Sequence, residues 1–183
     1  ASNALRRLYP TRYRISWETR RLGFRKNRGV SAWGIRLDND RLLTLGRVLD
    51  EAEEHLNEAS LEVAGQEYSL ADRTIQRWGN WASLADVTIG DQQSAGPAWT
   101  EGDLRTPERA EDCLIITSPT SRSIPIAVGR LTEKDGVWVI DPSLSFDATE
   151  WQAAAVVATS DQKLIGLLRV EDQTGEIILY KAK

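Results

Sequence analysis

The sequence predicts an all-β fold in two halves of about 90 residues each. Three observations support this. Short apolar runs of strand length recur along the chain, turn-forming residues separate them, and helical patterns are sparse. Runs of roughly 5–8 residues are typical of barrels and sandwiches. Residues 90–112 are rich in glycine, proline and charge, which predicts a surface connection between the two sets of strands.

The first half contains two predicted hairpins. SAWGIRL at 31–37 leads through the turn residues DND into RLLTL at 41–45, and SLEVAG at 60–65 precedes QEYSL at 66–70. The other predicted strands of this half are YRISW at 13–17 and LADVTI at 84–89.

The best helix candidate lies between the two hairpins. It is RVLDEAEEHLNEA at 47–59, where Leu49, Ala52 and Leu56 fall roughly on one face. Among so many strands, we expect a turn or a short helix here.

The second half predicts six more strands. They are CLIITS at 113–118, IPIAVGRLTE at 124–133, GVWVID at 136–141, AAVVATS at 154–160, KLIGLLRV at 163–170 and GEIILY at 175–180.

The predicted domain boundaries follow from these strands. The chain opens with ASNA and contains no methionine, so we interpret residues 1–4 as an expression-tag remnant and expect the natural protein to be longer. The first half then spans 5–95, the connection 96–110 and the second half 111–183. No run reaches the ~18 apolar residues of a membrane helix, so we expect no membrane segment in this part of the protein.

Charge is distributed unevenly. Residues 1–47 hold 12 Lys and Arg against 3 Asp and Glu, whereas the remaining residues hold 11 against 24. The basic segment at 6–28 suits an anionic surface such as phosphate or lipid, and it equally suits the acidic remainder of the same molecule. No nucleic-acid motif accompanies the arginines, so we predict no nucleic-acid partner.

The chain has one cysteine and one histidine, which limits its chemistry. Cys113 has no second cysteine with which to form an intramolecular disulfide. His55 alone makes a histidine-rich metal site impossible, and we predict no metal and no other cofactor.

Two short motifs in the first half stand in an informative order. Residues 44–49 read TLGRVL after a hairpin, and SLADVTI begins at Ser83. This order resembles a trypsin-like, HtrA-type serine protease domain, where a strand ends in Thr-x-x-His-Val and a later Asp-Leu-Ala strand carries the catalytic aspartate. The resemblance places Arg47 at the histidine position and Ser83 at the aspartate position.

A third motif lies near the end of the chain. WQAAAVVATSDQKLIGLL at 151–168 resembles the family's Gly-Asn/Asp-Ser-Gly-Gly segment and the strand, turn and Ile-Gly strand that follow it. Counting back from Ile165 and Gly166 places Ala153 at the nucleophile position. The two alanines that follow then occupy the family's glycine positions.

The resemblance implies a trypsin-like double barrel of two six-stranded antiparallel β-barrels, without a catalytic triad. Arginine stays protonated and cannot act as a base, and alanine has no hydroxyl. We therefore predict an inactive serine protease homologue, a pseudoenzyme that binds a peptide or protein partner within a larger bacterial protein. The family also implies an extracytoplasmic location, either periplasmic or secreted.

Acidic and aromatic residues are predicted to line the vacated cleft. We expect Arg47 to pair with Asp147 or Glu150 through a charge-assisted bond. Trp151 replaces a glycine that would permit positive φ near the oxyanion site. Trp151 and Trp99 are candidate binding residues, because loop indoles often anchor ligands.

The tryptophans leave a second function open. In strand patterns, Trp33 and Trp138 are predicted core residues. The remaining candidates lie in predicted turns or loops, where they would serve either as sugar-stacking platforms of a carbohydrate-binding module or as caps of a barrel end. They are Trp78, Trp81, Trp99 and Trp151.

A third class is an active hydrolase with an unfamiliar arrangement. Ser143 or Ser145 would then need His55 or a lysine as the base. Glycosidase-type acid–base chemistry would instead need paired carboxylates from the same loop. These are Asp141, Asp147 and Glu150.

Overall fold

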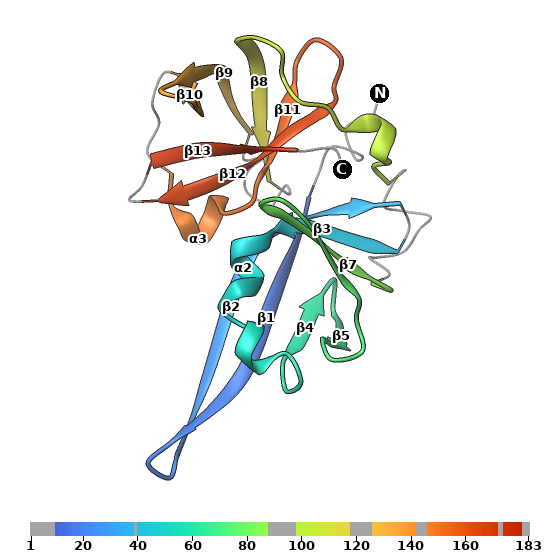
Figure 1. Cartoon of the computed structure of the whole chain (residues 1–183), viewed down its shortest axis with the longest axis vertical. Helices are drawn as coiled ribbons and strands as arrows, with labels where there is room; N and C mark the ends of the chain where they lie inside the picture. Colours follow the sequence, from blue (N-terminus) through green and yellow to red (C-terminus); the bar gives the residue numbers. More distant parts are fainter. Residues whose placement is uncertain are drawn as a thin grey trace.

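Figure 1 shows two β-sheet units that meet along one side, in a computed structural model of the chain. The predicted all-β class is confirmed, and the helices are short. The structure describes residues 10–38, 40–87, 98–117, 126–141, 146–171 and 174–180. Within these ranges, no helix has both the length and the apolar character needed to cross a membrane.

The first half forms a seven-stranded sheet in the order β5-β4-β1-β2-β3-β7-β6. Its strands are β1 (Thr11–Arg21), β2 (Phe24–Leu37), β3 (Arg41–Leu45), β4 (Ser60–Val63), β5 (Gln66–Ser69), β6 (Ile75–Trp78) and β7 (Trp81–Ala85). We predicted a closed six-stranded barrel here, but β5 and β6 end the order and do not pair with each other in the described residues. The reason lies in β1 and β2, which are long enough to pair with each other along all of β1 and still connect two smaller groups of strands.

Side-chain alternation explains where β1 lies. Tyr13, Ile15 and Trp17 are buried, while Arg14 faces solvent, as expected for a strand with one covered face. In β3, by contrast, four consecutive residues from Leu42 are buried, so both of its faces are covered.

The second half is a closed six-stranded antiparallel barrel in the order β10-β13-β12-β11-β8-β9. This confirms the six predicted strands. They are β8 (Glu111–Ile116), β9 (Ile126–Lys134), β10 (Val137–Asp141), β11 (Ala155–Ala158), β12 (Leu164–Glu171) and β13 (Thr174–Leu179). Among the described residues, the ladder between β10 and β13 is the shortest of the barrel, with two residue pairs, Trp138–Ile177 and Val139–Glu176.

In the described residues, four short helical turns connect the strands. The predicted short helix at 47–59 is confirmed as an α-helical turn followed by a 3-10 turn. The four are α2 (Gly46–Asp50), η1 (Glu53–His55), η2 (Glu101–Asp103) and α3 (Ala148–Trp151).

The two halves share one apolar core. Trp81 of the first half is fully buried, and its indole nitrogen donates to the Ile178 carbonyl of the barrel at 3.1 Å. Its ring also contacts Tyr180 edge-on, with 5.3 Å between ring centroids. Ala153 and Leu167 belong to the same buried cluster. A second cluster fills the barrel itself.

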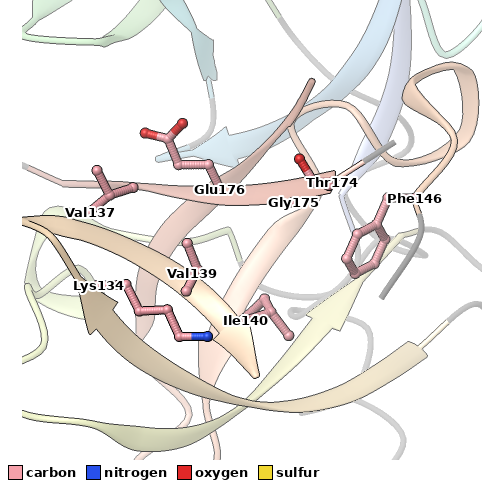
Figure 2. A pocket seen from close by; sticks show the side chains of 8 residues that line it. All are labelled: Lys134, Val137, Val139, Ile140, Phe146, Thr174, Gly175 and Glu176. Atoms are coloured by element: carbon pink, nitrogen blue, oxygen red, sulfur yellow. The ribbon is translucent and has the colours of Figure 1, made fainter. Parts of the chain in front are cut away.

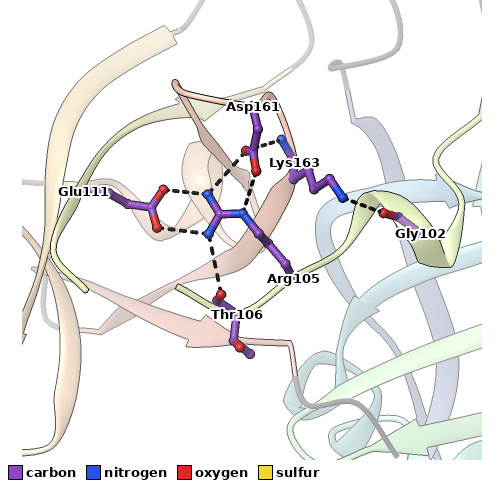
Figure 3. Close-up of polar contacts among 6 residues, drawn as sticks. All are labelled: Gly102, Arg105, Thr106, Glu111, Asp161 and Lys163. Atoms are coloured by element: carbon purple, nitrogen blue, oxygen red, sulfur yellow. Dashed lines mark hydrogen bonds and ion pairs between the residues drawn. The ribbon is translucent and has the colours of Figure 1, made fainter. Parts of the chain in front are cut away.

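The described part of the connection is bound to both halves. Trp99 forms a parallel bridge with Leu37, and Leu104 forms one with Leu164. Figure 3 shows Arg105 between two carboxylates of the barrel. Its guanidinium donates to Glu111 at 2.7 and 3.0 Å and to Asp161 at 2.8 Å. Because these bonds favour the charged forms, they raise the pKa of Arg105 and lower the pKa of Asp161.

Candidate functional site

Arg47 lies in the first turn of α2, at the junction of the two halves. Its Nη1 lies 2.5 Å from Glu171 Oε1 at the end of β12, and both side chains are about half exposed. The hydrogen bond from Arg47, together with the charge of Arg169, lowers the pKa of the Glu171 carboxyl. The predicted pairing of Arg47 with Asp147 or Glu150 is therefore wrong.

The two acids we expected to pair with Arg47 belong to the α3 segment. The Asp147 carboxylate accepts the Thr149 backbone N–H at 2.9 Å and so caps the helix. The Glu150 carbonyl accepts the Trp33 indole N–H at 2.5 Å. The capping bond holds the Asp147 side chain at the start of α3. Arg47 instead pairs with Glu171 at the end of β12.

Ser83 lies in the middle of β7. It is only 2% exposed, and its backbone stands opposite Leu43 of β3 and Gln76 of β6. A residue enclosed by strands on both sides has little room to reach a ligand in this conformation.

Ala153 follows α3 and is fully buried, with a φ of +66°. That left-handed backbone is uncommon for a residue with a Cβ, and it is where glycine is usually found. Its N–H donates to the Leu168 carbonyl at 2.8 Å, and the Ala154 N–H donates to the Trp151 carbonyl at 3.0 Å. The Trp151 N–H in turn donates to the Asp147 carbonyl at 2.9 Å. All three backbone N–H groups therefore donate to backbone carbonyls of the protein itself.

The α3 segment is held against the first half by several polar contacts. Arg12 donates to the Thr149 carbonyl at 2.5 Å, and the Trp33 backbone N–H donates to the Gln152 carbonyl at 3.0 Å. The Gln152 side chain also accepts the Val170 N–H of β12 at 2.7 Å. The structure thus brings α3 to β1 and β2, and Arg47 to β12. Within the described ranges, no hydrogen bond or ion pair joins Arg47, Ser83 and Ala153 to one another.

Of the two roles left open for the four loop tryptophans, burial excludes the sugar-stacking role for three of them. Trp99 is 2% exposed, so it is not a surface platform, and Trp78 and Trp81 are buried as well. Trp151 is half-buried against Phe146, with 5.4 Å between ring centroids. The two predicted core tryptophans, Trp33 and Trp138, are only half-buried.

Sequence reasoning missed a hollow of about 250 Å³ beside the short β10–β13 ladder. Figure 2 shows Val137 and Val139 of β10 opposite β13, with Phe146 at one end. Lys134 and Glu176 supply one charge of each sign. The lining residues come from three segments and carry no common motif, so the hollow has no signal in the sequence.

The hollow lies where backbone pairing stops. Ile140 and Asp141 pair with β9 on one side, but neither pairs with β13 on the other in the described residues. Gly175 belongs to the hollow too. A Cβ at Gly175 would approach the Phe146 ring to 2.9 Å, so the glycine makes room for that ring.

The other candidate reactive groups are occupied or lie elsewhere. Burial raises the pKa of the Cys113 thiol to about 12, which keeps it protonated and non-nucleophilic at neutral pH. His55 stacks on Trp17, with 5.9 Å between ring centroids. Ser143 and Ser145 lie outside the described residues.

In comparisons with known proteins, the chain matches no protein-family model, and no curated protein sequence matches it either.

Proposed function

We propose that this chain is a catalytically inactive, protease-like domain that binds an extended peptide or a protein partner. The observation that carries the proposal is the state of the three triad-like positions. They hold an ion-paired Arg47, an enclosed Ser83 and a buried Ala153. The trypsin-like double barrel belongs to the same proposal. It is supported by a closed barrel that shares its core with a second sheet.

Backbone chemistry supports the loss of activity independently of these side chains. An oxyanion hole needs N–H groups aimed at the position where negative charge develops. The N–H groups of Trp151, Ala153 and Ala154 instead donate to carbonyls of the fold. Restoring a serine at position 153 would therefore not by itself restore transition-state stabilisation.

A fluorophosphonate probe tests the absence of activity. We expect no covalent labelling of the chain and no digestion of casein, under conditions in which trypsin, the positive control, shows both. Labelling at any serine, located by mass spectrometry, would overturn the proposal, and Ser83→Ala would show whether that position was responsible.

The hollow at the β10–β13 ladder is the binding site we propose for the peptide. An extended peptide would pair with the backbone of Ile140 and Asp141, which have no β13 partner in the described residues, and place an apolar side chain against Val139 and Phe146. Lys134 would bind a polar group at the rim, where the Glu176 carboxylate already pairs with Arg169. This mode uses main-chain hydrogen bonds for affinity and the hollow for side-chain selection.

Selection from a random heptapeptide library displayed on phage tests this site. We expect enriched peptides to share one large apolar residue, and their binding to be lost in Val137→Asp at the hollow. Val128→Asp is the matched control, because Val128 is 72% exposed on β9 and does not line the hollow. Failure to enrich any sequence, or equal loss in both variants, would contradict the assignment.

The carbohydrate-binding alternative has weaker support. Of the four loop tryptophans that suggested it, Trp151 alone keeps part of its ring accessible. Glycan-array binding that is lost in Trp151→Ala would favour this alternative over the peptide site.

A further inference from the structure

The β1–β2 hairpin extends well beyond the two sheets (Figure 1). We call residues 20–28 the hairpin tip; every one of them is exposed. The tip carries five cations and no acid, and two apolar side chains stand at its end. Leu22 is 92% exposed and Phe24 is 78% exposed.

The turn of this hairpin contains Leu22, a residue type that the turn conformation disfavours. Leu22 and Gly23 both have positive φ, at +54° and +82°. Two-residue hairpin turns of this kind favour Asn, Asp or Gly at the first position, because other side chains are strained there. Asparagine at position 22 would remove both the strain and the exposed apolar surface.

Charge repulsion between the strands next to the turn is a second source of local destabilisation. Arg20 stands directly opposite Arg25, and like charges in that arrangement repel each other. Glu18 relieves part of this repulsion through an ion pair with Arg25 at 3.3 Å. Strain and repulsion that persist at one exposed place suggest a functional use rather than a structural one.

We propose that the hairpin tip docks the protein on an anionic lipid bilayer. Leu22 and Phe24 would enter the interfacial layer, while the arginines and Lys26 bind headgroup phosphates. A narrow convex tip fits a deformable surface, whereas a folded partner would need a matching groove. The chain beyond residue 47 holds 24 acids against 11 bases, so the same membrane would repel the body of the protein and leave the hairpin pointing toward it. This proposal is independent of the peptide site.

Vesicle sedimentation tests the proposal. We expect the chain to sediment with phosphatidylcholine vesicles that contain 30% phosphatidylserine, to do so much less with phosphatidylcholine alone, and to be released by 0.5 M NaCl. Salt release is expected because counterions screen exposed charges. Failure to sediment with either vesicle, or equal sedimentation with both, would overturn the proposal.

Tip variants separate docking from folding. Leu22→Asn is expected to weaken binding to the anionic vesicles by about tenfold through lost apolar burial. It should not lower the thermal unfolding midpoint, because the turn is relieved. Arg20→Gln removes the cross-strand repulsion and is expected to weaken binding about fivefold. Val128→Ser is the matched control and should bind as the parent does; variants that all bind equally would contradict the proposal.

A nucleic-acid arm completes the test. A single-stranded 20-mer oligonucleotide is expected to bind more weakly than the anionic vesicles, with no contribution from Leu22. Oligonucleotide binding as tight as vesicle binding would assign the tip to nucleic acid and overturn the lipid assignment.

Discussion

The two halves of this molecule end their strand pairing in different ways. The barrel closes on itself, so each of its six strands has two neighbours, and its weakest point is the two-pair ladder between β10 and β13. The first half keeps two edge strands, β5 and β6, and extends β1 and β2 into a hairpin beyond the sheet. The hollow lies where the pairing between β10 and β13 stops, and the hairpin tip lies beyond the residues of β1 and β2 that pair with β4 and β3. Both proposed binding surfaces are therefore places where a strand lacks one of its neighbours.

Despite this difference, the halves share a core, which makes their stabilities interdependent. The substitution with the largest expected effect on the free energy of unfolding tests that dependence. Trp81→Ala removes a fully buried indole and its hydrogen bond to Ile178, and we expect a loss of about 3–5 kcal/mol in the free energy of unfolding. Urea denaturation followed by fluorescence and circular dichroism should show one transition for both halves.

Trp81→Phe is the matched control. It keeps an aromatic ring and leaves the Ile178 carbonyl without its indole donor, so we expect a loss of about 1–3 kcal/mol. Two separate transitions in either variant would show that the halves are less coupled than the shared core indicates.

Glycine substitutions compare the packing of the two halves. A Cβ at Gly166 of β12 would lie 2.5 Å from an Ile177 methyl and 3.1 Å from the Ile178 carbonyl oxygen, which is backbone and cannot move easily. We expect Gly166→Ala to cost about 1–3 kcal/mol, measured by urea denaturation. Gly34→Ala should cost less, because the three atoms nearest to its Cβ would all be side-chain atoms, of Leu42 and Tyr13. The reverse order would show that the open sheet is the more rigidly packed half.

The connection between the halves provides a smaller effect. Arg105→Gln removes the paired bonds to Glu111 and Asp161, and we expect a loss of about 1–3 kcal/mol near neutral pH. Arg130→Gln removes an exposed pair with Asp112 and is the control, with an expected loss of about 1 kcal/mol or less.

The same cluster predicts a pH dependence. Arg105 lowers the pKa of Asp161 in the folded state, so this contribution to stability is present above the unfolded pKa of about 3.9 and is lost as pH falls through the lower folded value. Urea midpoints at pH 6 and pH 3 should therefore differ less in Arg105→Gln than in the parent. An unchanged difference would contradict the assignment.

The smallest effect is expected at Arg47, which our proposal places at a triad-like position. Arg47 and Glu171 form an exposed pair, so Arg47→Gln should leave the free energy of unfolding almost unchanged. A loss of several kcal/mol would show that Arg47 locks the two halves together. Glu171→Gln serves as the reciprocal variant and should behave in the same way.

The strands that could be predicted from the sequence contain apolar runs. The strand segments that could not be predicted are exposed or mostly polar. The barrel strands contain apolar runs that are readable without a fold, and RLLTL was recognised for the same reason. Residues 20–21 of β1 and 24–28 of β2 are all exposed, so hydrophobic alternation gives no signal there. β6 was missed because only Ile75 and Trp78 of its four residues are apolar.

The candidate site was less predictable than the fold. The sequence placed Arg47, Ser83 and Ala153 in order along the chain, but the partner of Arg47 comes from a strand 124 residues away. Trp99 is buried where it forms a parallel β-bridge with Leu37, and no local residue pattern predicts that bridge. Contacts between distant segments depend on packing, which local residue patterns do not encode.

The sequence by itself determined the strand-rich class, the division near the connection and the short helix after β3, because turn chemistry and side-chain periodicity act over a few residues. Tertiary structure decided that the second half forms a closed barrel while the first half stays an open sheet. It also decided which carboxylate pairs with Arg47 and where the hollow and the hairpin tip lie. These features depend on strand order and on the summed free energy of contacts between distant segments, and no window of neighbouring residues contains that information.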